Sequence, residues 1–160
     1  MFGFKKKAKV VELRAIANGQ LLPITQVADE VFSQKMMGDG YAIEPTDGVI
    51  KAPAAGEIKT IAETKHAIMM TTTDGLELLF HLGLDTVELQ GSPFELSVKV
   101  GDQVNAGDPL ITMDLEAVKA AAKATTVMVV VTNMDQVATV DVESAKAVTT
   151  TDVVARVTLK

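Results

Sequence analysis

The stretch that decides the fold is Thr64–Gly91, which reads TKHAIMMTTTDGLELLFHLGLDTVELQG. Asp74-Gly75 separates two apolar runs, and each run carries one of the two histidines in the protein. Asp-Gly between alternating apolar residues is a strong hairpin signal, because a type I′ turn needs positive φ at both central residues. The sequence therefore predicts two antiparallel strands joined at Asp74-Gly75.

The hairpin makes a prediction about the two histidines. If the Asp-Gly pair forms a two-residue turn, Ile68 lies opposite His81 and His66 lies diagonally from His81, where Cβ atoms about 7 Å apart let long side chains meet. One face of the hairpin then carries Thr64, His66, Ile68, Leu79 and His81. We therefore expect the two imidazoles to contact each other. A slip of one residue would place them on opposite faces, and two unrelated histidines are the alternative.

A specific motif, GLELLFHLGLDTVEL, occupies Gly75–Leu89. It is similar to the active-site signature of the glucose-type enzyme IIA family of the bacterial sugar phosphotransferase system. The resemblance covers nearly the whole chain from Leu21 onward, and its further blocks are Gly38–Pro45, Val49–Ile58, Glu63–Ala67, Gly101–Leu110 and Val131–Asp135.

The resemblance implies a role for particular residues. His81 matches the histidine that is transiently phosphorylated, and His66 matches its partner histidine. Thr64, Asp39 and Asp85 match polar residues that surround the pair. The implied function is a cytoplasmic phosphohistidine carrier, which accepts a phosphoryl group from the histidine phosphocarrier protein HPr and passes it to the IIB domain of a sugar transporter. Regulatory protein targets are also implied.

A histidine pair suits this chemistry. Neutral imidazole is a good nucleophile near physiological pH, and the P–N bond that it forms stays reactive enough to pass the group onward. Phosphoryl transfer goes through a loose, roughly in-line transition state, so the protein mainly positions the group and stabilises its oxygens. We expect His66 and Thr64 to donate hydrogen bonds to those oxygens.

Further side chains are expected to serve partner docking. The apolar rim, which would exclude water in a docked complex, is predicted to consist of Leu79, Ile68, Leu82 and Leu84. Asp39 and Asp85 are expected to pair with basic residues of a partner, although Asp39 between two glycines is equally suited to a turn.

The pair of histidines also raises the question of a metal. Two imidazoles leave a tetrahedral zinc short of ligands, which argues against an independent zinc hydrolase. The resemblance implies instead a zinc ion that bridges His66 and His81 to a carboxylate of a partner. No cofactor is required for the carrier function.

Composition indicates one domain, residues 10–160, behind a basic tail at residues 1–9 that lacks the apolar core of a signal peptide. No apolar run reaches the roughly 20 residues of a transmembrane helix. Cysteine is absent, which excludes disulfides and cysteine nucleophiles and fits a reducing compartment. The net charge of −6 argues against nucleic acid. We expect a cytoplasmic monomer without stable membrane insertion, in which the tail is solvated or touches an anionic surface.

Short apolar runs broken by Gly, Pro, Asp and Asn predict an all-β fold, an antiparallel β-sandwich or barrel-sandwich hybrid with internal duplication. One short helix is expected over Asp114–Ala124 with Asp114 as its N-cap, and a helical turn over Asp29–Met37. The expected strands are Glu12–Ala17, Gly19–Pro23, Tyr41–Glu44, Gly48–Lys51, Gly56–Ile61, His66–Thr72, Leu76–Leu82, Glu95–Val98, Pro109–Met113, Thr126–Thr132, Thr139–Val142 and Ala155–Leu159.

A second stretch offers an alternative function. Val98–Leu110 followed by Leu115–Lys119 resembles a biotin- or lipoate-type carrier domain, in which Lys119 would hold the cofactor. A carrier lysine needs an exposed turn, whereas Lys119 falls within the predicted helix.

Overall fold

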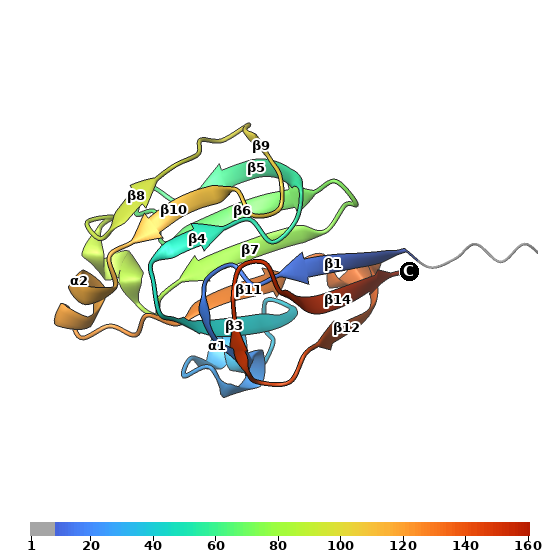
Figure 1. Cartoon of the computed structure of the whole chain (residues 1–160), viewed down its shortest axis with the longest axis horizontal. Helices are drawn as coiled ribbons and strands as arrows, with labels where there is room; N and C mark the ends of the chain where they lie inside the picture. The colour runs from blue at the N-terminus through green and yellow to red at the C-terminus, as the bar shows by residue number, and fades with distance from the viewer. Residues whose placement is uncertain (1–8) are drawn as a thin grey trace, which may run out of the picture.

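The computed structural model describes residues 9–160, which form three antiparallel sheets (Figure 1). The largest sheet has eight strands in the order β13 (Ala147–Val148), β2 (Gly19–Pro23), β3 (Asp39–Pro45), β11 (Val127–Val131), β7 (Glu77–Leu82), β6 (Ala67–Thr72), β5 (Gly56–Ile61) and β9 (Gln103–Val104). A three-stranded sheet consists of β1 (Val10–Arg14), β14 (Val153–Leu159) and β12 (Val137–Val142). A second one consists of β4 (Val49–Lys51), β10 (Pro109–Met113) and β8 (Phe94–Leu96).

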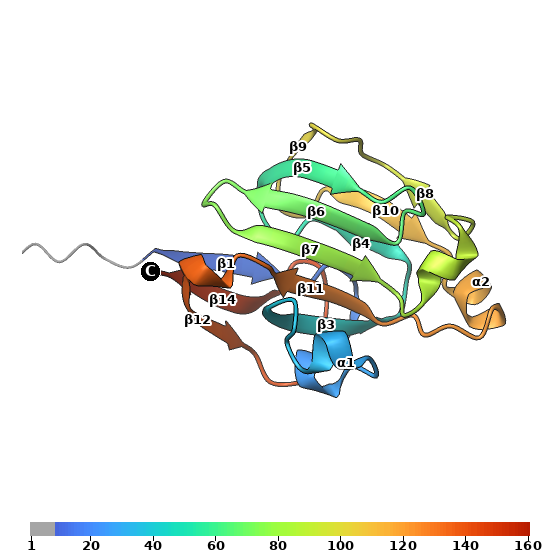
Figure 2. The same ribbon diagram turned by 180° about the vertical axis from the view of Figure 1, so that it is seen from behind.

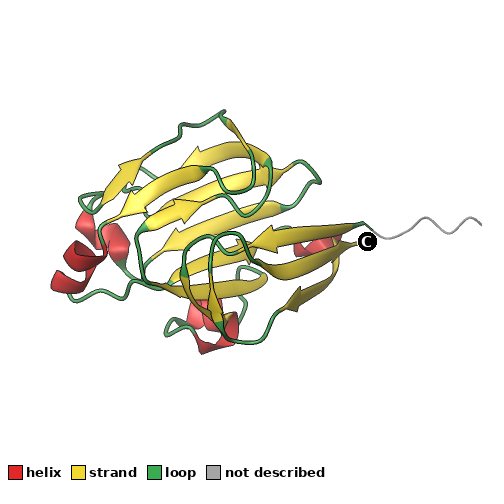
Figure 3. Cartoon of the chain, in the orientation of Figure 1, coloured by secondary structure: helices red, strands yellow, loops and turns green. Residues whose placement is uncertain are grey.

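The predicted antiparallel all-β class is confirmed (Figure 3). The small sheet of β4, β10 and β8 lies over one side of β5, β6 and β7, as opposite views show (Figures 1 and 2). The sheets stay open and do not close into a barrel. Three expected strands, Gly19–Pro23, Gly56–Ile61 and Pro109–Met113, match the structure at both ends. The two-residue strands β9 and β13 were not expected, because two residues are too few to show an alternating pattern.

Helical segments are short, and side chains cap both α-helices. In α1 (Glu30–Ser33), the Asp29 carboxylate accepts a hydrogen bond from the Val31 N–H at 2.9 Å. In α2 (Leu115–Ala120), Asp114 accepts one from the Ala117 N–H at 3.1 Å, as predicted. Ala122 then adopts a left-handed φ of 60°, so α2 ends before Ala124. The 3-10 helices are η1 (Ile24–Gln26), η2 (Thr86–Leu89) and η3 (Met134–Gln136).

The centre of the eight-stranded sheet, at β3, β11 and β7, is largely buried on both faces. Along β7, Leu78, Phe80 and Leu82 point into the main core, and the intervening Leu79 points the opposite way. That opposite face carries a second buried group, the outer cluster, which comprises Ile24, Val27, Phe32, Ala42, Leu79, Leu84, Met128 and Val130. Helix α1 contributes Phe32 to this cluster beside β3 (Figure 2).

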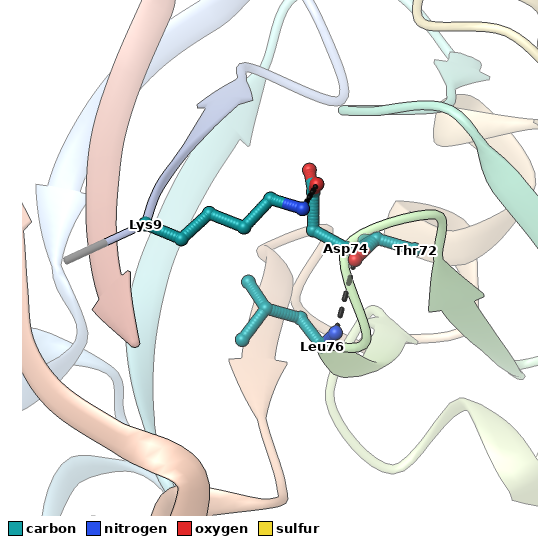
Figure 4. A network of polar contacts seen from close by, with 4 residues as sticks. All are labelled: Lys9, Thr72, Asp74 and Leu76. Atoms are coloured by element: carbon teal, nitrogen blue, oxygen red, sulfur yellow. Dashed lines mark hydrogen bonds and ion pairs between the residues drawn. The ribbon is translucent and has the colours of Figure 1, made fainter. Parts of the chain in front are cut away.

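The hairpin of β6 and β7 forms as predicted, but with a different turn and register. Thr72 and Leu76 flank a three-residue loop, in which the Gly75 N–H donates to the Thr72 carbonyl at 2.9 Å. Of the loop residues only Gly75 has positive φ, at 96°, so the turn is not type I′. The Thr72 hydroxyl accepts from the Leu76 N–H at 3.0 Å, and Lys9 pairs with Asp74 at 2.7 Å (Figure 4).

The extra loop residue moves the register by one. Ala67 lies opposite His81, and Ile68 lies opposite Phe80. The prediction that Ile68 shares a face with the histidines is therefore wrong, because Ile68 is fully buried in the main core.

The predicted basic tail lies outside the described residues except for Lys9. No helix within residues 9–160 is long and apolar enough to cross a bilayer.

Candidate functional site

The two histidines meet, although the register that predicted their contact is wrong. Their ring centroids lie 5.2 Å apart at an interplanar angle of 78°. His66 comes immediately before β6, behind a tight turn in which Lys65 has a φ of 60° and its N–H donates to the Ala62 carbonyl at 2.8 Å. Strict alternation of side chains applies only inside a strand, so this turn can direct His66 to the face of His81.

The ring of His81 is fixed by a backbone carbonyl. Its Nδ1 lies 2.8 Å from the Gly83 carbonyl oxygen. A carbonyl oxygen only accepts hydrogen bonds, so Nδ1 carries the proton in the neutral ring. The lone pair of the neutral imidazole is therefore on Nε2, which is the atom of this ring that could act as a nucleophile.

His66 has a different partner. Its Nδ1 lies 2.7 Å from the Thr64 hydroxyl, which can donate to it. With that donation, Nε2 of His66 carries a proton and acts as a hydrogen-bond donor. The pair then presents one nitrogen lone pair, on His81, and one N–H donor, on His66.

Burial favours the neutral form of both imidazoles by lowering their pKa values. Burial lowers the pKa of His81, and the adjacent His66 lowers it further. The hydrogen bond to Gly83 and the charges of Asp29 and Asp85 act to raise this pKa without cancelling the effect of burial. Burial also lowers the pKa of His66. Unprotonated rings are thus favoured at pH 7, and only an unprotonated Nε2 can attack phosphorus.

The outer cluster forms the wall behind the histidines. The ring of Phe32 lies 4.8 Å from that of His81, and Phe32 is only 5% exposed. Leu79 and Leu84, both predicted, belong to the same cluster. Sequence reasoning missed Phe32 and Asp29, because only the tertiary fold brings α1 to His81. The signal in the sequence was that Phe32 is a large apolar residue within the predicted helical turn over Asp29–Met37, which indicates that this turn packs against the core.

Two residues of the predicted rim have to be corrected. Leu82 and Ile68 have no exposed surface and lie in the main core, so neither can line a docking surface.

The two predicted aspartates have different surroundings. Asp85 is exposed with a left-handed φ of 58° and adjoins the histidine turn as the N-cap of η2. Asp39 binds the Gly40 N–H at 2.8 Å and pairs with Lys35 at 3.4 Å. Ala42 and His81 both pair with Met128, so they lie level with each other across the sheet. Asp39 is three residues before Ala42, which places it about 10 Å along the strand from that level. Asp39 is thus the first residue of β3, and the partners of its side chain are Gly40 and Lys35 rather than the histidines.

Comparison with known proteins agrees with this geometry. A family model described as "phosphoenolpyruvate-dependent sugar phosphotransferase system, EIIA 1" matches residues 11–137. The chain belongs to this family. EIIA proteins carry phosphoryl groups in sugar phosphotransferase systems, so the sequence-based prediction of a phosphoryl relay is confirmed at this level.

Individual EIIA relatives cover most of the chain. A glucose-specific EIIA component of Halalkalibacterium halodurans is 48% identical over 91% of this chain and 88% of its own length. A glucose-specific EIICBA component of Streptococcus pneumoniae is 46% identical over 92% of this chain, which spans 20% of that larger protein. The solved structure of glucose permease IIA from Mycoplasma capricolum matches with a TM-score of 0.87 and 37% identity, covering 98% of this chain and 99% of that one.

An EIIA site of this kind offers little to a metal on its own. Residues 9–160 contain no group of three or more His, Cys, Asp and Glu side chains that could hold a metal ion. Both Nδ1 atoms already have partners, which leaves one nitrogen on each histidine. A tetrahedral zinc would need its remaining ligands from another molecule.

The alternative carrier lysine is also poorly placed. Lys119 lies in the last turn of α2, where its Nζ is 3.7 Å from Glu116. It is not at a hairpin tip, which is where a biotin or lipoate carrier presents its lysine.

Proposed function

We propose that this EIIA chain is a cytoplasmic phosphohistidine carrier, which takes a phosphoryl group from HPr onto His81 and passes it to the IIB domain of a sugar transporter. The observation that carries the proposal is the hydrogen bond from Nδ1 of His81 to Gly83 beside a second imidazole. The names of the relatives favour a glucose transporter as the acceptor.

The transfer step conserves atoms and electrons. The lone pair on Nε2 of His81 forms a bond to phosphorus while the bond between phosphorus and the donor's histidine nitrogen breaks. The leaving nitrogen keeps that electron pair. The proton on Nδ1 remains in place, bonded to Gly83, and the same sequence runs in reverse onto the nucleophile of the acceptor.

His66 and Thr64 act on the oxygens of the phosphoryl group. The Thr64 hydroxyl donates to Nδ1 of His66 and so leaves the proton of that ring on Nε2, while the ring itself lies 5.2 Å from that of His81. A donor held in place before the reaction stabilises charge as it shifts during transfer. This role matters in both directions of the relay.

Docking is expected on the surface that surrounds this pair. The exposed large apolar side chains on and after α1 and in η2 are Val31, Met36, Met37 and Val87. Acidic side chains on the same two segments are Asp29, Glu30, Asp85 and Glu88. An apolar centre with an acidic border fits partners with a basic face, and such contacts are weak and sensitive to salt.

The test is phosphorylation by phosphoenolpyruvate and the general phosphotransferase proteins, followed by intact mass. The wild-type chain should gain one acid-labile phosphate, and His81→Ala should gain none. His66→Gln keeps an amide donor of similar reach and should still be labelled. Its onward transfer to IIB should be slower by on the order of 10²-fold, because the oriented imidazole donor is lost.

Lys119→Ala serves as the matched control and should be labelled as the wild type is. Labelling of His81→Ala, or a biotin adduct on Lys119 in cells, would contradict the proposal.

A further inference from the structure

The position of the Gly83 carbonyl decides which nitrogen of His81 is nucleophilic, so the groups that hold this carbonyl matter. Gly83 has a left-handed φ of 81°, and its N–H donates to the Thr126 carbonyl at 2.8 Å. The N–H of Leu84, which belongs to the same peptide group as the Gly83 carbonyl, donates to the Ala124 carbonyl at 3.1 Å. These bonds attach the turn to the start of β11.

The peptide group between Leu82 and Gly83 contains that Gly83 N–H and the Leu82 carbonyl. One peptide group earlier, the Leu82 N–H donates to the His66 carbonyl at 2.8 Å. The Leu82 carbonyl accepts a hydrogen bond from the Thr86 hydroxyl at 2.6 Å. All four polar atoms of the two peptide groups beside Gly83 therefore have partners, and the only side chains among those partners belong to His81 and Thr86.

Thr86 is itself held rigidly. It is fully buried, and its methyl carbon would lie 2.4 Å from a Cβ atom added to Gly83, which means that Thr86 packs directly on this glycine. A threonine side chain has few rotamers, and burial leaves it little freedom to move.

We propose that Thr86 is a positioning residue: its hydroxyl, bound to the Leu82 carbonyl, holds the turn so that the Gly83 carbonyl faces Nδ1 of His81 and leaves Nε2 as the attacking atom. The inference rests on the proposed role of His81 as phosphoryl acceptor. Thr86 acts through the backbone and touches neither the phosphoryl group nor the imidazole in this role.

The test compares variants that differ in the hydroxyl. Thr86→Val keeps the shape and removes the hydroxyl, whereas Thr86→Ser keeps the hydroxyl and removes the methyl group. In ¹⁵N spectra of histidine-labelled protein, the wild type and Thr86→Ser should show His81 protonated at Nδ1. Thr86→Val should show a mixture of the two tautomers, and its phosphoryl uptake should slow by roughly tenfold, less than the ~10²-fold cost of a misplacement of about 1 Å.

A matched control lies at the other end of the same hairpin. Thr72 is buried, and its hydroxyl also bonds to backbone, through the Leu76 N–H (Figure 4). Leu76 is five residues before His81, roughly 17 Å along the strand. Thr72→Val should therefore lower stability in a similar way without altering the tautomer or the rate of uptake.

The outcomes separate this inference from the proposed function. If the wild-type chain takes up no phosphate, the proposed function fails. If it does and Thr86→Val keeps both the Nδ1–H signature and the rate, the positioning role is refuted. Loss of the signature in Thr86→Ser would refute it too. If Thr86→Val does not fold, Thr86→Cys replaces it, because a thiol is a weak donor in the same space.

Discussion

Phe32→Ala should raise the pKa of His81. Burial is the largest cause of the lowered pKa of His81, and the aromatic ring of Phe32 lies 4.8 Å from the imidazole. Removal of this ring admits water beside the imidazole, which favours its charged form. The pKa of His81 should therefore move back toward the ordinary value of about 6.5.

The stability change can be worked from the same contacts. Truncation of a buried Phe to Ala destabilises proteins by about 3–5 kcal/mol. Phe32 is 5% exposed and sits on a four-residue helix that can settle onto the outer cluster, so we expect the lower end, about 3 kcal/mol. Domains unfold at about 5–15 kcal/mol, so the variant should remain folded.

Two measurements test this variant. NMR titration of the His81 ring gives its pKa, and urea unfolding gives the free energy of unfolding. Val31→Ala on the same helix is the control, since Val31 is 41% exposed and should change stability by less than about 0.5 kcal/mol. An unchanged pKa of His81 in Phe32→Ala, together with the expected loss of stability, would refute the role assigned to burial.

Three further outcomes are expected. Asp85→Lys should slow association with HPr, and its defect should shrink as salt rises; equal wild-type rates across a salt series would contradict this electrostatic account. The folded-state pKa values of both histidines lie below the unfolded value of about 6.5. Their contribution to stability is therefore complete above about pH 6.5 and is lost as the pH falls below it. Below about pH 6.5, the urea midpoint of the wild type should fall more steeply with pH than that of His81→Ala. Gly75→Ala should cost about 1–2 kcal/mol, because φ is 96° and no atom lies within 4 Å of the new Cβ, with phosphoryl uptake unchanged; a slower uptake would show that the hairpin tip influences the site.

The sequence predicted the hairpin but not its register, because the register depends on the number of residues in the loop. Asp-Gly suits a two-residue turn and also the end of a three-residue loop with glycine in the left-handed region, and the flanking threonines do not distinguish the two. The choice moves Ile68 from the surface to the core. The side chain of His66 contacts His81 because the positive φ of Lys65 turns the chain just before β6, and the alternation of side chains along a strand does not predict such a turn.

For the rest of the site, the sequence predicted which types of side chain take part but not where they lie. The family motif pointed to His81, His66 and Thr64, whose chemistry is visible in their side chains, and their roles stay predictions. The Gly83 carbonyl and the ring of Phe32 act through position alone. The position of Phe32 depends on contact between α1 and β7, and that of Gly83 depends on hydrogen bonds to Ala124 and Thr126, which are distant in sequence. The position of Asp39 was not predictable either, because its match to the family motif says nothing about its distance from the histidines.

Strand β7, which carries His81, has neighbours on both sides. Every residue of β7 except the first pairs with β11, and every residue except the last pairs with β6. Backbone amides in such central strands exchange with solvent mainly through opening of the whole domain. The backbone that carries His81 is therefore a rigid part of the sheet, and the proposed donor and acceptor would each have to fit the same surface in turn.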